Sequence, residues 1–171
     1  MKTLNPLFAS LLVAFAMAGA KPAVTADKMS SGSGKIYDGY LKIQQALAGD
    51  DFQKAGNASK ALFDTLKAAS PNASKSSWDS AVANIRKSVE PLAAAKNIRD
   101  LRNGFTKVAA PVAEAIEKFG MKSGSPAFLF HCPMHGPHGS DWLQKDKSTA
   151  NPYFGSEMPE CGSLVREVKK R

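Results

Sequence analysis

The stretch KIYDGYLKIQQALAGDD, residues 35–51, has the first clear helical pattern in this chain of 171 residues. Its apolar and amphipathic residues recur every three or four positions, as they do on one face of an α-helix. They are Tyr37, Tyr40, Leu41, Gln44 and Leu47. Gly49 is a helix stop signal, and Asp50 or Asp51 can cap a second helix directly afterwards. The stretch therefore predicts a helix, a short connection and a second helix.

Three more segments downstream repeat this spacing. The second helical stripe contains Phe52, Ala55, Ser59, Leu62, Phe63 and Leu66, the third contains Trp78, Val82, Ile85, Val89 and Leu92, and the fourth contains Ile98, Leu101, Phe105, Val108, Val112, Ile116 and Phe119. Asn97 can cap the fourth helix and Gly120 can end it. Pro91 and Pro111 lie inside the third and fourth segments, and each should kink or break its helix because proline has no backbone N–H.

Short connections between four amphipathic helices favour an up-and-down antiparallel bundle. We therefore predict an all-α fold, with a four-helix bundle over residues 35–120 and an irregular C-terminal cap over residues 121–171 that contains Cys, Met and His. Residues 35–171 form one domain in this prediction. The apolar stripes contain no ionisable pair that indicates catalysis, and Trp78 and the tyrosines are expected to serve in packing.

The N-terminal residues have the pattern of a cleaved signal peptide. Lys2 precedes an apolar run over residues 7–17, and candidate cleavage sites end at Ala20 and Ala26. A membrane anchor, the alternative, needs about 20 apolar residues, which is more than this run supplies. We predict a signal peptide over residues 1–26, export, and no stable membrane insertion after cleavage.

Residues 27–34 include the sequence SSGSG, which predicts a flexible spacer before the first helix. The whole chain is basic, with 23 Lys and Arg residues against 15 Asp and Glu residues and a formal net charge of +8. A net positive charge can favour binding of the protein to anionic surfaces. The chain lacks the interleaved aromatic and basic residues that bind single strands, so no nucleic-acid partner is expected.

The stretch FLFHCPMHG, residues 128–136, is rich in metal-ligating residue types. In an extended segment, side chains alternate between two faces. Phe128, Phe130, Cys132 and Met134 would share one face, and Leu129, His131 and His135 the other. The third histidine of the chain, His138, follows directly.

Sulfur-containing residues recur once more near the C-terminus. Cys132 and Met134 are separated by one residue, and Met158 and Cys161 by two. Thiolate and thioether ligands together select soft ions, Cu(I) above all, whereas structural zinc sites usually take only Cys and His. We predict that Cys132, Met134, Met158 and Cys161 bind Cu(I), or another soft ion, with His131 or His135 assisting.

Two other interpretations of the same residues stay open. Cys132 and Cys161 can form a structural disulfide in an oxidising compartment, and Met134 and Met158 can fill gaps in a core. The protein would then be a non-enzymatic interaction module of the cell envelope that holds no metal. A catalytic Cys132 would need an orienting group such as Asp141 or Asn151, and no motif supports one, so we do not expect an enzyme.

The motif HCPM…WLQ…NPYFGSEMPECGSLVREV resembles the C-terminal signature of the DUF3347 family. IYDGYLKIQQALAGDDFQKA is similar to the first helix pair of that family, and LRNGFTKVAAPV to its R-x-x-F helix, so the resemblance extends from Lys35 to the C-terminus. It implies an exported bacterial, all-helical domain with a C-terminal Cys/Met motif. The family occurs alone or fused to the periplasmic adaptors of CusB-like heavy-metal efflux systems.

The resemblance also implies a function. It assigns Cys132, Met134, Met158 and Cys161 to the sulfur motif, with an aromatic frame that consists of Trp142, Asn151, Pro152, Tyr153, Phe154 and Gly155. CPMH is similar to the CPMHP motif of copper pumps and adaptors, with Gly136 in place of the proline. We therefore expect a periplasmic protein that buffers copper or delivers it to an efflux adaptor or another envelope protein.

Overall fold

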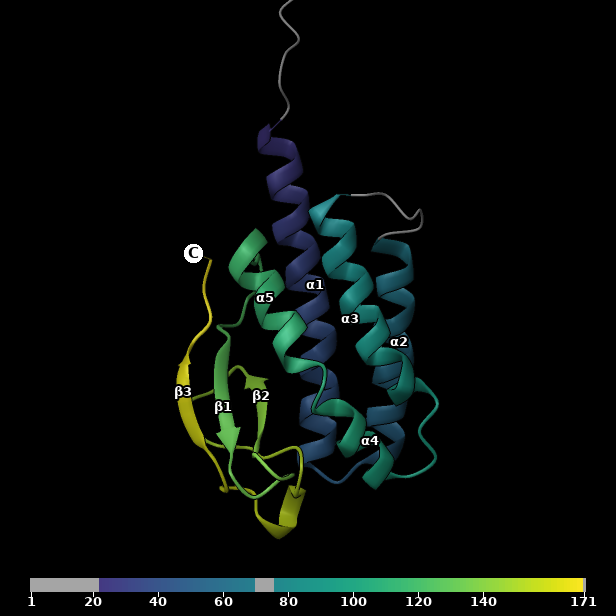
Figure 1. Cartoon of the computed structure of the whole chain (residues 1–171), viewed down its shortest axis with the longest axis vertical. Helices are drawn as coiled ribbons and strands as arrows, with labels where there is room; N and C mark the ends of the chain where they lie inside the picture. Colours follow the sequence, from purple (N-terminus) through teal and green to yellow (C-terminus); the bar gives the residue numbers. More distant parts are fainter. Residues whose placement is uncertain (1–21, 70–75, 171) are drawn as a thin grey trace, which may run out of the picture.

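The computed structural model describes residues 22–69 and 76–170. Within these residues the chain forms five helices and a three-stranded sheet (Figure 1). The elements are α1 (Pro22–Ala48), α2 (Phe52–Ala69), α3 (Ser77–Ala93), α4 (Ile98–Phe105), α5 (Ala109–Phe119), β1 (Phe128–Cys132), β2 (Ser140–Gln144), the 3₁₀ helix η1 (Gly155–Glu157) and β3 (Ser163–Glu167). The helical part of the prediction is confirmed. The all-α class is wrong, because the cap contains an antiparallel sheet instead of irregular chain.

The four stripes predicted from the sequence form the core of the bundle. All five residues of the first stripe, from Tyr37 to Leu47, are buried in α1. The ring of Tyr40 stacks on Phe105 of α4, with 4.9 Å between the ring centroids. Asn97 caps α4 through its side chain, which accepts a hydrogen bond from the backbone N–H of Asp100 at 2.9 Å.

The predicted fourth helix is divided into α4 and α5. The break lies at residues 106–108, and Pro111 is the third residue of α5. A proline is tolerated in the first turn of a helix, because backbone N–H groups there form no hydrogen bond within the helix. In the interior of one continuous helix over α4 and α5, the same proline would remove a backbone hydrogen bond. The predicted break at Pro111 is therefore confirmed. Pro91 lies in the last turn of α3, which ends at Ala93.

The predicted flexible spacer over residues 27–34 is wrong, because α1 already begins at Pro22. Ser33 and Gly34 are buried. A side chain at Gly34 would overlap the carbonyl oxygen of Lys122, and one at Gly32 would overlap the ring of Trp78. The small residues therefore permit close helix packing at this position. The predicted signal peptide, apart from residues 22–26, lies outside the described residues.

The sheet has the strand order β2-β1-β3, and both pairs are antiparallel. Along β1, Phe128, Phe130 and Cys132 are buried while Leu129 and His131 are partly exposed. This confirms the alternation predicted for an extended segment. The C-terminal part of the predicted irregular cap forms the edge strand β3.

Three polar side chains of α1 connect the bundle to the backbone of the cap. The hydroxyl of Tyr37 donates a hydrogen bond to the carbonyl of Pro126 at 2.8 Å. The side-chain amide of Gln44 donates a hydrogen bond to the carbonyl of Ala150 at 2.8 Å. The hydroxyl of Tyr40 accepts a hydrogen bond from the backbone N–H of Leu143 at 2.9 Å. Helices and sheet also share one hydrophobic core, so the helices fix the position of the cap. In the described part of the chain, no helix combines the length and the apolar character needed to cross a bilayer.

The contact at Gly34 predicts a large effect of a small substitution. Gly34→Ala should lower the free energy of unfolding by about 1–3 kcal/mol, the usual range for overpacking a tight contact, because the methyl group would force α1 away from residue Lys122. The measurement is urea denaturation followed by circular dichroism.

Gly56→Ala is the matched control, because no atom outside α2 lies within 4 Å of its added methyl group. It should raise stability by about 0.5–1 kcal/mol through helix propensity alone. Equal effects of the two substitutions would contradict this account of α1 packing.

Candidate functional site

The two cysteines of the chain lie next to each other at one end of the sheet. Cys132 is the last residue of β1 and is fully buried, while Cys161 precedes β3 and is partly exposed. The pairing of His131 with Ser163 between the two strands brings them together. Their sulfur atoms are 3.6 Å apart. Because a disulfide bond is about 2.05 Å long, both residues are thiols in this structure.

Asn151 connects the two cysteines. Its side chain is fully buried, and its Nδ2 donates to the carbonyl of Cys161 at 2.6 Å and to the Sγ of Cys132 at 3.3 Å. Its Oδ1 accepts the backbone N–H of Tyr153 at 2.8 Å, which forms an Asx-type turn. The backbone N–H of Asn151 also donates to the carbonyl of Pro159 at 3.0 Å. One side chain therefore contacts the thiol of Cys132, the backbone of Cys161 and the loop between them.

The environment of Cys161 favours its protonated form. Desolvation raises the pKa of the Cys161 thiol, and the hydrogen bond and charge of Cys132 raise it further. A thiol has to lose its proton before it can bind a metal ion. Any ion that binds Cys161 at neutral pH must therefore release that proton.

The two candidate methionines have different surroundings. Met158 is partly buried and directly follows η1, and its carbonyl accepts the backbone N–H of Cys161 at 3.2 Å. It therefore lies in the same turn as the exposed thiol. Met134 lies in the turn after β1, and it is 62% exposed to solvent.

The two candidate histidines have partners other than the thiols. His131 lies on the opposite face of β1 from Cys132, and its Nδ1 is 2.7 Å from Oδ1 of Asp141 on β2. His135 stacks on Tyr153, with 4.3 Å between the ring centroids, and its Nδ1 is 3.0 Å from Oγ of Ser140. Burial, and to a lesser degree the charge of Arg102, lowers the pKa of His135. His131 is thus not brought to the sulfur atoms that it was predicted to assist.

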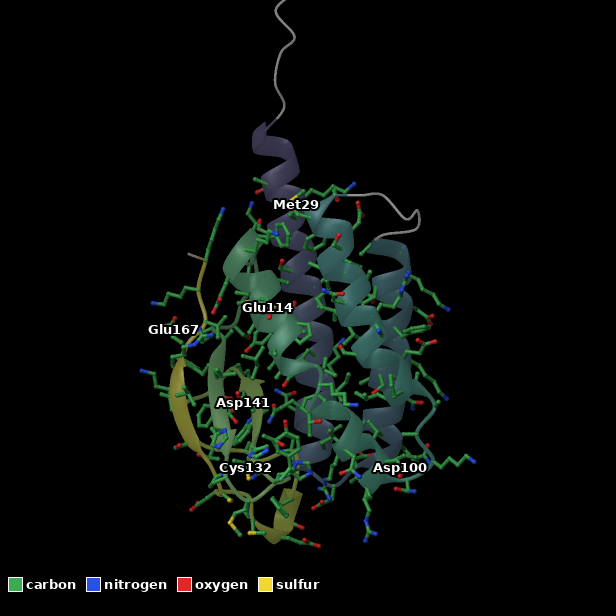
Figure 2. All side chains as sticks on the ribbon, in the orientation of Figure 1. Met29, Asp100, Glu114, Cys132, Asp141 and Glu167 are labelled. Atoms are coloured by element: carbon green, nitrogen blue, oxygen red, sulfur yellow. The ribbon has the colours of Figure 1, made fainter. Side chains whose placement is uncertain are left out.

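Over residues 22–69 and 76–170, no group of three or more His, Cys, Asp or Glu side chains is placed to hold a metal ion. An ion at the thiol pair would therefore need a third ligand of another kind, such as a methionine sulfur or a ligand from a partner. Figure 2 shows Cys132 at the end of the molecule far from Met29. The site would thus lie at one end of the protein.

Arg102 and Asp50 hold the loop that carries Asn151. Nε of Arg102 donates a hydrogen bond to the carbonyl of Pro152 at 3.0 Å. Nη2 of Arg102 donates to the carbonyl of Leu47 at 3.0 Å and to Oδ1 of Asp50 at 2.5 Å. Asp50 also accepts the backbone N–H of Ser156 at 2.9 Å. The hydrogen bonds from Ser156, followed by that from Arg102, lower the pKa of Asp50 to about 2.

Sequence reasoning missed the functions of these polar residues. Asn151 appeared only as part of an aromatic frame and as a possible orienting group for a catalytic cysteine, and Arg102 only as the arginine of the R-x-x-F motif. The Asn-Pro dipeptide is a turn signal, but no local pattern indicates which sulfur atom a buried amide will contact.

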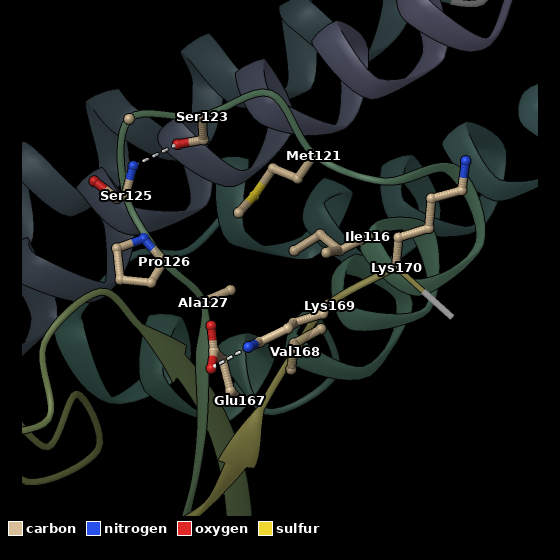
Figure 3. Close-up of a pocket in the computed structure, with 11 residues that line it drawn as sticks. Ile116, Met121, Ser123, Ser125, Pro126, Ala127, Glu167, Val168, Lys169 and Lys170 are labelled. Carbon is tan, nitrogen blue, oxygen red and sulfur yellow. Dashed lines mark hydrogen bonds and ion pairs between the residues drawn. The ribbon is translucent and has the colours of Figure 1, made fainter.

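A cavity of about 360 Å³ lies beside the end of β3 farther from Cys161 (Figure 3). Ile116, Met121 and Pro126 are among the residues that line it, together with Lys169, whose Nζ pairs with Glu167 at 2.8 Å. The lining residues include neither Cys nor His. We assign no function to this cavity.

The ion pair of Asp50 predicts a pH-dependent contribution to stability. Because its pKa is lowered in the folded protein, the carboxylate stabilises the fold above the ordinary pKa of about 3.9, and this stabilisation is lost as the pH falls towards 2. Asp50→Asn should cost no more than about 1 kcal/mol at pH 7, because the pair is partly exposed. Denaturant unfolding at pH 7, 4 and 2.5 should show the two proteins converging at low pH. A difference that does not change with pH would contradict the ion-pair explanation.

Asn151→Ala removes the hydrogen bonds that position the thiols. It should lower the free energy of unfolding by about 1–3 kcal/mol, because buried polar groups lose their partner. Chemical denaturation of the reduced protein measures the loss. Asn103→Ala is the control at an exposed position of α4, with an expected change within about 0.5 kcal/mol. Equal stability of both variants would show that Asn151 does not hold the loop.

Comparison with known proteins gives one match. Residues 36–124 match the model of a family described as "Protein of unknown function (DUF3347)". The matched segment covers more than half of the chain, from α1 to the residues before β1, and it ends before both cysteines and all three histidines. No curated protein and no solved structure matches the chain.

Proposed function

The chain belongs to the DUF3347 family, and we propose that it is an exported protein whose cap binds one soft metal ion, Cu(I) above all. Cys132 and Cys161 are the principal ligands in this proposal. The task would be periplasmic copper buffering, or delivery to a heavy-metal efflux adaptor or another envelope protein. Fusion of related domains to such adaptors, which the sequence resemblance implies, supports this partner class.

The distance between the thiols is the observation that carries the proposal. Two sulfur ligands that share one tetrahedral ion, each at about 2.3 Å, lie about 3.8 Å apart. The sulfur atoms of Cys132 and Cys161 are 3.6 Å apart without an ion. Two thiols thus already lie at nearly the spacing that an ion requires. Thiolate ligands favour soft ions such as Cu(I).

Met158 is the best-placed third ligand. It shares a turn with Cys161, and both are partly exposed while Cys132 is buried. A thioether beside two thiolates strengthens the preference for Cu(I) over zinc. An ion would therefore enter and leave on the side of Cys161 and Met158. In this proposal the exposed Met134 captures the ion before it reaches the thiols.

The same short distance supports a second candidate function. In an oxidising compartment the two thiols can lose two protons and two electrons to a disulfide oxidant and form a disulfide bond. The protein would then be a non-enzymatic interaction module of the envelope that binds no metal. Leu164 and Val165, exposed on the edge strand β3, are the apolar residues available for docking.

An anaerobic Cu(I) titration of the reduced, signal-free protein against a competing chelator tests the proposal. One ion per chain should bind. Cys132→Ser and Cys161→Ser should each weaken binding by more than about 100-fold, because even the loss of an outer-shell contact costs about 10–100-fold. Met158→Leu should weaken binding less, and Met29→Leu, at the other end of the molecule (Figure 2), should leave it unchanged.

Unchanged affinity in the Cys132→Ser protein would exclude the thiol pair as the site. Thiol counting on protein from its native compartment separates the two candidates. No free thiols, together with a reduced form that does not compete for Cu(I), would favour the interaction module.

A further inference from the structure

All three histidines of the chain line one groove, at the hairpin end of β1. The groove has a volume of about 500 Å³ and lies between the β1–β2 hairpin and the junction of α4 with α5. His131, His135 and His138 contribute to its wall together with Asp141 and Ser140. We call it the histidine groove. The function proposed above does not use it.

Hydrogen bonds fix the tautomers of two of these histidines. The carboxylate of Asp141 can only accept, so Nδ1 of His131 must carry the proton that joins them at 2.7 Å. The hydroxyl of Ser140 donates its single proton to the carbonyl of His135 at 2.9 Å. It must therefore accept from Nδ1 of the same histidine at 3.0 Å. In the neutral form of both rings, Nε2 therefore carries the lone pair.

Gly139 leaves space beside the Nε2 atom of His131. Its φ angle is +74°, a conformation that favours glycine. A Cβ atom at this position would overlap Cε1 and Nε2 of His131. Any other residue here would cover the nitrogen whose lone pair is free. The turn after β1 therefore keeps a potential ligand atom accessible.

We propose that the histidine groove is a second metal site, which binds a borderline divalent ion such as Zn(II) or Cu(II) through Nε2 of His131 and Nε2 of His135. Imidazole suits these ions. At most metal sites the ligating histidine donates its other N–H to a carboxylate, a carbonyl or water, which is the arrangement of His131 with Asp141. Because no group of three or more His, Cys, Asp or Glu side chains among the described residues is placed to hold an ion, two imidazoles would hold this one and water would complete its coordination.

This site does not depend on the proposed copper site. Successive residues of β1 alternate between its faces, so His131 and Cys132 cannot bind the same ion without unfolding the strand. The cap would thus offer sulfur ligands to a soft ion at the thiol pair and nitrogen ligands to a borderline ion in the histidine groove. Either site can fail while the other remains.

A zinc chloride titration by calorimetry tests the second site in the Cys132→Ser/Cys161→Ser double variant, which leaves only the imidazoles. One ion should bind per chain. Adding His131→Ala or His135→Ala should weaken binding at least about tenfold, and Asp141→Asn by about tenfold, as expected for an outer-shell partner. Asp64→Asn, which changes an exposed carboxylate of α2 outside the groove, is the matched control for Asp141→Asn and should leave the affinity unchanged.

Absence of zinc binding to the folded double variant would overturn the proposal, as would binding that is unchanged by His131→Ala and His135→Ala. Should the double variant fail to fold, imidazole nitrogen resonances of the reduced wild-type protein supply the same test. Zinc should shift the Nε2 resonances of His131 and His135. Resonances that do not move while zinc binds would place the ion at the thiols and overturn the histidine site.

Discussion

The position of the cap depends on hydrogen bonds from the buried stripe of α1. Tyr37, Tyr40 and Gln44 contact three separate stretches of cap backbone, at Pro126, Leu143 and Ala150. Burial raises the pKa of Tyr40 well above its usual value, so its hydroxyl stays protonated. A buried polar group without a partner costs about 1–3 kcal/mol. These side chains therefore allow one placement of the sheet on the helices, and the thiols are positioned with it.

A second set of contacts continues from the bundle to the sulfur atoms. Arg102 of α4 holds the carbonyl of Pro152, and the preceding residue, Asn151, donates to both Cys132 and Cys161. The thiols are thus connected through two side chains to the turn between α1 and α2. A site fixed in this way keeps its geometry without an ion, which lowers the cost of ordering ligands when an ion binds. Cys161 and Met158 are partly exposed, so a partner could reach an ion bound at the proposed site from this side.

The sequence predicted the helices well because their apolar stripes are long and regular. It also predicted the faces of β1, including the placement of His131 and Cys132 on opposite sides. The sheet itself was missed, because β2 and β3 do not alternate between buried and exposed residues. The last three residues of β2 are all buried, and every residue of β3 is exposed. The SSGSG stretch was misjudged because its composition is that of a linker, whereas its packing on Trp78 and Lys122 makes it helical. The sequence assigned both cysteines to one site, but only the structure shows that the buried amide of Asn151 contacts the thiol of Cys132 and the carbonyl of Cys161.

The most direct measurement of the central claim is X-ray absorption at the copper edge, on reduced protein loaded anaerobically with one equivalent of Cu(I). The account predicts a first coordination shell made of two or three sulfur atoms at about 2.3 Å. Two of them would be the thiolates of Cys132 and Cys161. A first shell of nitrogen and oxygen atoms alone would contradict the account, because the ion would then be bound away from the thiol pair.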